Sequence, residues 1–490
     1  MPRRSGILLP VASLPSNYGI GDFGPTAFSF LDWLTAAGQR AWEVLPLLLT
    51  DGGGSPFSPP SSFAMNWLLV SPKQLMRDGW IIQRELDDAR QSSKRISYPQ
   101  IIRSKRHIIG RAWQRFRSSG SLAERRRFDR FRTAERWWLD DYCLFMAIKD
   151  VHHGKPWWTW PVPLRDRNPR ALVGWRRQQA TGLDYYAFGQ WLAREQWNAV
   201  RRYASQNGIR IIGDLPYGVT HDSVDVWANR HFFRVRRDGA MTAVSGAPPD
   251  VFYKNGQVWG NPLYNWRALQ RIRFAWWTKR LRTALDWYDE VRLDHFRGFH
   301  AVWSIPARRP NARRGHWERV PGEKLFREVE RIVPFSRIIA EDLGKLTPAV
   351  HRLRDAFAFP GMRIVQFGFR KPLAKLHHPA VYPKNSICYT GTHDMPPLRM
   401  WRSQLSDEER AALRKTFGTI PAVRELVRTA LHAKSDTALI PIADLLELGP
   451  DARINTPGIV SRRNWTWRLD TLPPQSLAKW LRKETRKAGR

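Results

Sequence analysis

Short apolar runs recur along the chain, and each ends abruptly in polar residues or in a Gly/Pro cluster. A continuous apolar run of this length is typical of a strand that is buried on both faces. Eight such runs are present: Gly6 to Leu9, Ala41 to Leu45, Ile209 to Ile212, Val291 to Leu293, Ile338 to Ala340, Met362 to Val365, Ile387 to Tyr389, and Ala438 to Ile442.

Between many of these runs, apolar residues follow the 3.6-residue period of a helix. The helical stretches are Phe28 to Ala37, Phe188 to Tyr203, Trp266 to Trp287, Glu323 to Ile332 and Pro348 to Phe357. Strands that alternate with helices indicate a parallel sheet, and eight strands are the number of a (β/α)8 barrel. We therefore predict the α/β class and a (β/α)8 TIM barrel formed by a single catalytic domain, residues 1–490.

The spacing of the predicted strands is uneven. The interval from Leu45 to Ile209 is much longer than one strand–helix unit, so we predict a largely helical insertion subdomain at 46–205. A second excursion, 228–265, is rich in Gly, Pro and aromatic residues and is predicted to be a long active-site loop. The stretch Pro473 to Arg490 again has helical spacing.

Composition supports a folded globular protein. Of 490 residues, 42% are hydrophobic and 25% are charged. Two cysteines, Cys143 and Cys388, are too few for a disulfide framework or a Cys-rich zinc site. No run approaches the roughly 18 apolar residues that a membrane span needs, so no membrane association is predicted and the expected location is cytoplasmic.

The net charge is the unusual feature of the composition. Lys and Arg number 80 and Asp and Glu 44, which gives +36. Such a balance raises a nucleic-acid-binding protein as an alternative. The basic residues are scattered rather than gathered in one block, and no helix-turn-helix, zinc finger or RNP pattern is present. We therefore expect no nucleic acid as a partner.

Four predicted strands are followed by an acid: Asp214, Asp294, Glu341 and Asp394. The carboxyl ends of all barrel strands converge on one face, where active sites lie, so these acids are expected to share a cavity. A single acid of this kind could instead cap the next helix. Four in equivalent positions favour chemistry, because a carboxylate at the end of an apolar strand loses hydration unless it is paired or used.

Glycoside chemistry uses several carboxylates and no metal. One carboxylate attacks the anomeric carbon, and a protonated acid serves the leaving oxygen. Arg292 lies two residues before Asp294, hence on the same strand face, where its guanidinium would keep the carboxylate ionised. Trp259 lies in a turn-rich segment, and aromatic faces pack on sugar rings. The adjacent pairs His152-His153 and His377-His378 are predicted to be surface histidines.

At these residues the sequence resembles the 4-α-glucanotransferases known as amylomaltase or disproportionating enzyme, which are relatives of the α-amylases. The matching stretches are Ser13-Leu14-Pro15, Tyr18-Gly19-Ile20-Gly21-Asp22-Phe23-Gly24, Trp42-Glu43-Val44-Leu45-Pro46-Leu47, Gly213-Asp214-Leu215-Pro216, Gln257-Val258-Trp259-Gly260-Asn261-Pro262, Arg292-Leu293-Asp294-His295-Phe296-Arg297-Gly298, Ala340-Glu341-Asp342-Leu343-Gly344, Gly391-Thr392-His393-Asp394 and Asn455-Thr456-Pro457-Gly458.

The resemblance implies roles for individual residues. Asp294 matches the nucleophile, Glu341 the general acid/base, and Asp394 the third acid, which stabilises the transition state. The implied substrate-binding residues are Arg292, His393, Asp214, Trp259, Gln257, Ser55 and Phe57, the last standing where the family has a tyrosine. No metal and no cofactor are implied.

The implied reaction is retaining transfer of an α-1,4-glucan segment through a covalent glucosyl-enzyme. Donors would be malto-oligosaccharides, glycogen or starch, and acceptors the 4-hydroxyl of a glucan or of glucose. The alternative is an amylase-type α-glucan hydrolase, because the acids alone do not separate transfer from hydrolysis. Transfer requires loops that exclude water, for which the candidates are Gly52 to Ser62 and Ser245 to Asn255. The sequence does not specify the oligomeric state.

Overall fold

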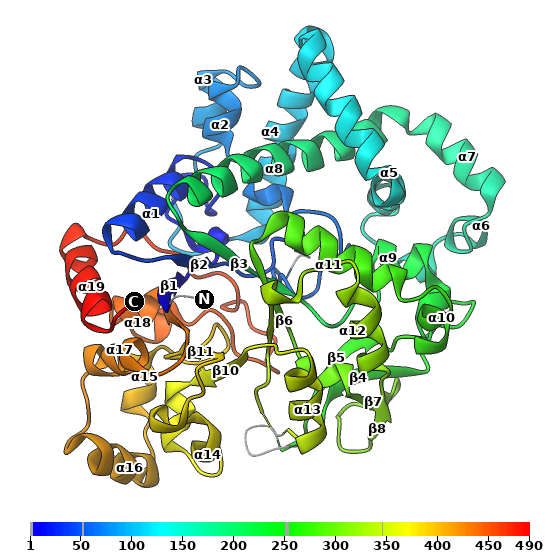
Figure 1. The fold of residues 1–490 in the computed structure, drawn as a ribbon. Helices are drawn as coiled ribbons and strands as arrows, with labels where there is room; N and C mark the ends of the chain where they lie inside the picture. Colours follow the sequence, from blue (N-terminus) through cyan, green and yellow to red (C-terminus); the bar gives the residue numbers. More distant parts are fainter. Residues whose placement is uncertain (1–2, 51–52, 250–253, 345) are drawn as a thin grey trace.

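Eight parallel strands close into a barrel (Figure 1). The computed structural model describes residues 3–50, 53–249, 254–344 and 346–490. The strands follow the order β1-β12-β11-β10-β9-β6-β3-β2 around the barrel. They are β1 (Arg4–Leu8), β2 (Ala41–Glu43), β3 (Arg210–Leu215), β6 (Glu290–Leu293), β9 (Ile338–Ala340), β10 (Gly361–Ile364), β11 (Ser386–Tyr389) and β12 (Thr437–Pro441). The predicted (β/α)8 fold is confirmed, and each predicted apolar run supplies one strand.

The barrel interior is apolar below and polar at the carboxyl ends of the strands. Its apolar residues form one buried cluster: Leu8, Ala41, Ile212, Ile339, Met362, Ile364, Ile387, Tyr389 and Leu439. Two residues beyond Ala41 and Ile212, on the same strand faces, come Glu43 and Asp214. Arg292 pairs in register with Asp214. Charged groups are thus placed in the upper part of the barrel interior.

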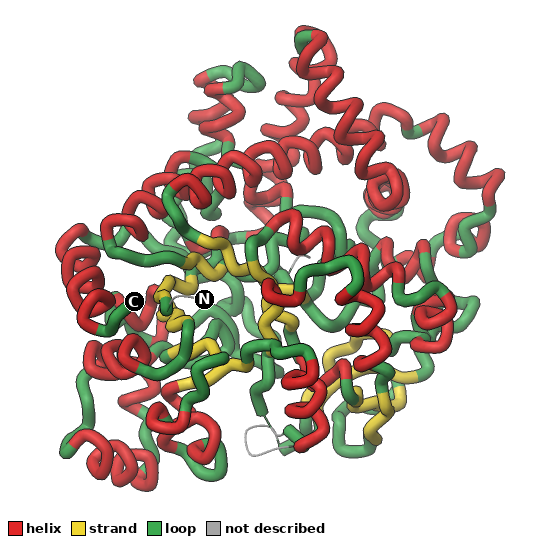
Figure 2. Tube along the Cα trace, in the orientation of Figure 1, coloured by secondary structure: helices red, strands yellow, loops and turns green. Residues whose placement is uncertain are grey.

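Helices surround the strands (Figure 2). Outside the 46–205 segment they are α1 (Pro25–Ala36), α9 (Val224–Ala228), α10 (Trp266–Arg271), α11 (Ala275–Trp287), α12 (Gly322–Glu330), α13 (Pro348–Ala356), α14 (Ala374–His377), α15 (Leu398–Ser403), α16 (Asp407–Phe417), α17 (Val423–His432), α18 (Ile442–Leu445) and α19 (Gln475–Lys487). The last confirms the helix predicted between Pro473 and Arg490. Among the helices of the described chain, none is long and apolar enough to cross a membrane.

The segment 46–205 is largely helical, and its long helices fill the top of the view in Figure 1. Its helices are α2 (Pro72–Arg77), α3 (Gln83–Asp88), α4 (Tyr98–Ser119), α5 (Leu122–Val151), α6 (Val162–Arg165), α7 (Pro169–Gln178) and α8 (Ala180–Gln206). Three of them meet through a cluster of aromatic rings: Trp113, Phe116, Phe128, Phe188 and Trp191. The definition of this segment as a subdomain remains a prediction.

The excursion 228–265 is more ordered than the predicted loop. It contains β4 (Ala243–Ala247) and β5 (Gln257–Pro262), which join β7 (Ala301–Pro306) and β8 (His316–Arg319) in an antiparallel sheet of order β5-β4-β7-β8. Glycines within both strands hide this pattern, and the pairing of β4 with β5 is irregular between Val244 and Gly246. The partners β7 and β8 lie far along the chain, so local sequence does not reveal the sheet.

Two further predictions are corrected by the structure. The single helix predicted from Trp266 to Trp287 is broken into α10 and α11, because Arg273 and Phe274 between them adopt left-handed φ angles of 50° and 55°. His377 is not a surface residue: it is 3% exposed, and its Nδ1 accepts a hydrogen bond from the Ile364 amide at 3.1 Å.

Candidate active site

An ion-paired group of three residues forms the centre of the site. One guanidinium nitrogen of Arg292, Nη1, lies 2.6 Å from Asp214 Oδ2 and 3.1 Å from Asp294 Oδ1. The Asp294 side chain is 28% exposed, whereas that of Asp214 is 1% exposed. Burial alone would lower the pKa of Arg292, yet the surrounding carboxylates hold it well above its usual value. Asp294 is therefore a solvent-accessible carboxylate beside a permanent cation.

This geometry differs from the expectation that Asp214 touches the glucan. Asp214 occupies the inward position of β3, in register with Arg292, so its side chain is covered. Burial raises the pKa of Asp214, with Arg292 opposing the shift. In the structure Asp214 contacts the site through its ion pair with Arg292.

Glu341 lies beside Asp294 because their strands are adjacent and in register. Leu293 of β6 pairs with Ala340 of β9, and each acid is the next residue. Two backbone amides hold the carboxylate: that of His295 donates to Oε2 at 2.8 Å and that of Leu343 to Oε1 at 2.9 Å. Burial raises the pKa of Glu341 to about 8; the negative charge of Asp294 adds to this, and Arg292 and the two amides oppose it. Glu341 is thus predominantly protonated at neutral pH.

The turn after β6 brings two glucan-binding candidates to these acids. His295 has a left-handed φ of 48°, an uncommon conformation outside glycine that is found at functional sites. Its ring lies 4.6 Å from that of Trp259, edge to face, and Trp259 Nε1 donates to Gln257 Oε1 at 3.2 Å. Burial lowers the pKa of His295 to about 4, so this imidazole is neutral. Trp259 and Gln257 of β5 therefore border the Asp294–Glu341 pair.

Asp394 lies in the loop after β11. Its Oδ1 accepts a hydrogen bond from Asn455 Nδ2 at 2.7 Å and lies 3.5 Å from His393 Nε2. Burial lowers the pKa of His393, and the negative charges of Asp394 and Asp294 oppose that shift. Asp294 is therefore near enough to His393 to act on its charge state.

The early substrate loop joins the site through an aromatic stack. The Phe57 ring lies parallel to the His393 ring, 5.2 Å between centroids, and 5.7 Å from that of Trp465. Ser55 Oγ accepts the Phe57 amide at 3.3 Å and so fixes the turn that presents this ring. Of the two predicted water-excluding segments, Gly52 and residues 250–253 lie outside the described residues.

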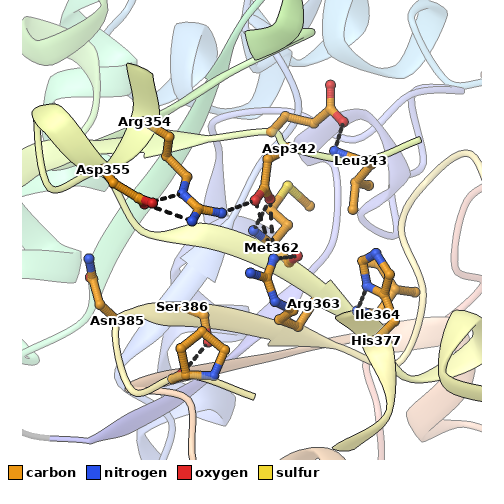
Figure 3. A network of polar contacts seen from close by, with 12 residues as sticks. Asp342, Leu343, Arg354, Asp355, Met362, Arg363, Ile364, His377, Asn385 and Ser386 are labelled. Atoms are coloured by element: carbon orange, nitrogen blue, oxygen red, sulfur yellow. Dashed lines mark hydrogen bonds and ion pairs between the residues drawn. The ribbon is translucent and has the colours of Figure 1, made fainter. Parts of the chain in front are cut away.

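A network of polar contacts surrounds Asp342, the residue that follows Glu341 (Figure 3). Asp342 follows Glu341 and is buried between Arg354 and Arg363. Its Oδ1 also accepts the Met362 amide at 2.6 Å, which ties the end of β9 to β10. Because these partners hold Asp342, the backbone position of the neighbouring Glu341 is fixed as well.

Glu43 and Tyr389 are neighbours of the site that the sequence analysis missed. Both project into the barrel interior near Arg292. Burial raises the pKa of Glu43 to about 7, with Arg292 opposing the shift. The signal was present, since Glu43 lies inside the predicted run Ala41 to Leu45 and an acid there must face the interior or the helices. Asn455 and Trp465 were likewise missed as contacts of Asp394 and His393.

The assembled groups can perform acid–base and nucleophilic chemistry. A protonated carboxylic acid and an ion-paired carboxylate lie on adjacent strand ends, beside a tryptophan and a second polar pair. Among the residues that the structure describes, no group of three or more His, Cys, Asp or Glu side chains could hold a metal ion. Cys143 and Cys388 are buried free thiols.

Comparison with known proteins shows what this chain as a whole is similar to. The sequence profile of the 4-alpha-glucanotransferase family matches residues 9–473. The 4-alpha-glucanotransferase of Thermus thermophilus is 41% identical over 96% of this chain and 95% of its own length. The chloroplastic/amyloplastic 4-alpha-glucanotransferase of Solanum tuberosum is 39% identical over 95% of this chain and 82% of its own length.

Solved structures agree. The amylomaltase from Streptococcus agalactiae in complex with acarbose superposes with a TM-score of 0.95 at 32% identity, covering 100% of this chain and 99% of that one. The amylomaltase from Corynebacterium glutamicum, at 19% identity and a TM-score of 0.76, covers 99% of this chain and 75% of its own and supports the fold alone.

Proposed function

The chain belongs to the 4-alpha-glucanotransferase family, and from that premise we propose that Asp294, Glu341 and Asp394 carry out its retaining transfer of α-1,4-glucan segments. The observation that carries the proposal is the pairing of Leu293 with Ala340, which sets the two acids side by side. Retention through a covalent intermediate requires their carboxyl groups to lie about 5–5.5 Å apart.

In the first step, the Asp294 carboxylate attacks the anomeric carbon while Glu341 protonates the bridging oxygen. Arg292, 3.1 Å from Asp294, favours the ionised nucleophile. The raised pKa of Glu341 favours the protonated acid at neutral pH. Glu341 therefore begins the reaction in the protonated state that the step needs. The C–O bond breaks, the glucosyl–Asp294 ester forms, and the reducing-end segment leaves.

In the second step, Glu341 has lost its proton and acts as the base. It removes the proton of the acceptor 4-hydroxyl, whose oxygen attacks the anomeric carbon and displaces Asp294. The overall configuration is retained because two inversions have occurred. Transfer rather than hydrolysis needs an acceptor site that holds a sugar in preference to water, and the Phe57 ring beside His393 supplies an apolar wall for it.

Asp394 is proposed to bind hydroxyls of the reacting sugar. Asn455 and His393 both contact its Oδ1, which leaves Oδ2 for the substrate. Hydrogen bonds to sugar hydroxyls that strengthen in the transition state contribute several kcal/mol in glycosidases. Trp259 and Gln257 are proposed to bind the glucan on the β5 side, and Ser55 and Phe57 on the other.

The substrates are proposed to be malto-oligosaccharide donors, with glycogen or starch as larger donors, and glucan or glucose acceptors. The acarbose held by the Streptococcus agalactiae amylomaltase supports α-glucan recognition by a fold of this kind. No cofactor takes part in the mechanism.

The test is incubation with maltotriose followed by sizing of the products. A transferase yields glucose together with oligosaccharides longer than maltotriose, whereas a hydrolase yields shorter products alone. Asp294→Asn is expected to abolish both glucose release and chain lengthening, because an amide does not form the ester intermediate. Undiminished glucose release by Asp294→Asn would refute the nucleophile assignment.

Asp88→Asn is the matched control. It makes the same chemical change at an exposed carboxylate of α3, so both products should form at the unaltered rate. Shortened products alone from the unaltered protein would assign the site to hydrolysis and refute the proposed role of the acceptor wall.

A further inference from the structure

An open pocket lined by arginines lies outside the proposed active site. One wall is the chain that follows α9, the other is α10, and the cavity volume is about 600 Å³. Small-molecule sites usually measure roughly 300–1,000 Å³. None of the residues proposed above for catalysis or glucan binding lines it. Its basic and polar lining residues are Arg230, His231, Arg236, Arg237, Asn265 and Arg271.

The positive charge of this pocket is only partly compensated. Four guanidinium groups line it, and no Asp or Glu of the described chain does. The nearby Asp166 lies 3.2 Å from Arg230 and 3.7 Å from Arg237. Arg236 and Arg271 are exposed and have no ion-pair partner among the residues that the structure describes. Two guanidinium forks are thus available to a ligand.

The pocket is preformed, because backbone contacts join its two walls. Phe233 and Tyr264 form an antiparallel bridge, and the Asn265 amide donates to the Phe232 carbonyl at 2.8 Å. Asn265 Nδ2 also donates to the His231 carbonyl at 3.1 Å. A ligand would therefore meet walls that are already ordered, which lowers the entropic cost of binding.

Apolar side chains complete the lining: Phe232, Phe233, Val235, Ala268 and Ile272. A ligand that suits this lining has an anionic group, which contacts the arginines, and a ring or apolar face, which contacts the apolar side chains. We propose that this pocket binds a small molecule that carries a phosphate ester, either a nucleotide or a sugar phosphate. Guanidinium forks match phosphate oxygens in bidentate geometry. A pocket of this limited size favours a small molecule over nucleic acid, which needs an extended basic stripe.

The test is calorimetric titration of the whole protein with ADP, glucose 1-phosphate and orthophosphate. The double variant Arg236→Gln/Arg271→Gln removes the two unpaired cations. We expect saturable binding of at least one phosphate ester by the unaltered protein, and an affinity at least tenfold weaker in the double variant. Preference for ADP identifies the nucleotide, and preference for glucose 1-phosphate identifies the sugar phosphate.

The control is Arg126→Gln/Arg331→Gln, which lowers the net charge equally at two exposed arginines outside the pocket. Equal weakening by the control would overturn the site, since net charge would then explain the binding. Absence of saturable binding by all three ligands would overturn it too, as would a duplex oligonucleotide binding where they do not. The proposal does not rest on the transferase mechanism, so maltotriose disproportionation by the double variant should be unchanged.

Discussion

The strand ends of the barrel and the long helices α4, α5 and α8 differ in where their charged side chains lie. At the strand ends, Glu43, Asp214 and Arg292 are buried and act on one another. In the helices, aromatic rings fill the interior, and ion pairs such as Arg136–Asp140 lie at the surface, with side chains 79% and 48% exposed. Both regions belong to one chain of net charge +36.

This difference separates the region that we expect to carry out the reaction from the region that we expect to stabilise the fold. A buried charge loses hydration and is retained only where partners or function compensate for the loss. Aromatic packing stabilises without such a loss, and exposed ion pairs contribute little. Substitutions in the first region should therefore change reaction rates and pH dependence, and substitutions in the second should change stability alone.

The largest effect is expected at Glu341. Glu341→Gln should slow transfer from maltotriose by about 10²–10⁴-fold, because the leaving oxygen loses its proton donor. With α-maltosyl fluoride as donor and azide as acceptor, neither step needs a proton transfer, so the loss measured by fluoride release should be much smaller. In the unaltered protein, kcat/KM for maltotriose should fall as pH rises through about 8, where Glu341 loses its proton.

The control for this comparison is Glu330→Gln, an exposed glutamate at the end of α12, which should leave both donors unaffected. An equal loss on the fluoride and on maltotriose would show that Glu341 is not the proton donor.

A large effect of the other kind is expected at Phe188. Its buried ring lies 4.9 Å from Phe116 and 5.2 Å from Trp113. Phe188→Ala should lower the free energy of unfolding by about 3–5 kcal/mol through lost burial and the cavity left behind. Urea unfolding measures this. The kcat/KM of the remaining folded protein should stay within a few-fold, and Phe188→Leu should destabilise much less.

Were Phe188→Ala to reduce kcat/KM as strongly as a change at the strand ends, the separation between the two regions would fail.

An intermediate effect is expected at Glu43, and it depends on pH. Its pKa is raised from 4.5 to about 7 by burial, so the folded state holds a proton that the unfolded state releases earlier. The stabilisation is present below the unfolded pKa and is lost as pH rises through the folded one. Glu43→Gln keeps a neutral side chain, so between pH 5 and 8 the stability difference should move in its favour by about 2–3 kcal/mol.

Urea unfolding at both pH values measures this shift, and Glu330→Gln should show none of it. A stability difference that is constant with pH would mean that Glu43 ionises freely in the folded protein.

The smallest effect is expected at the surface of α5. Arg136→Gln breaks an exposed ion pair between residues four apart and should change the free energy of unfolding by less than about 0.5 kcal/mol. A change of several kcal/mol in the same urea experiment would show that surface charge supports the helical region after all.

The barrel was predictable because its strands are buried on both faces and therefore read as apolar runs. The second sheet was not, because β4 pairs with β7 near residue 300 and because both β4 and β5 contain glycines. The break between α10 and α11 escaped prediction as well: Arg273 and Phe274 are compatible with a helix, and only their left-handed conformation ends it. Long-range pairing and single backbone angles leave little trace in local sequence.

For the site, the rule that acids follow strands found Asp214, Asp294, Glu341 and Asp394 and placed all four near the barrel mouth. It did not separate the buried Asp214 from the accessible Asp294, because that distinction depends on the register between β3 and β6, in which Asp214 pairs with Arg292, two residues before Asp294. It passed over Glu43, which ends a strand in the same way. Asn455 reaches Asp394 from a loop 61 residues along the chain, a contact that no spacing predicts.

The two amides on Glu341 have a consequence for how this site can change over time. Main-chain donors do not depend on which side chains are attached at His295 and Leu343. The backbone path thus sets the orientation of the Glu341 carboxyl group, and the surrounding side chains are free to vary. New acceptor preferences can therefore arise at the rim by ordinary substitution, without turning the group that drives bond cleavage.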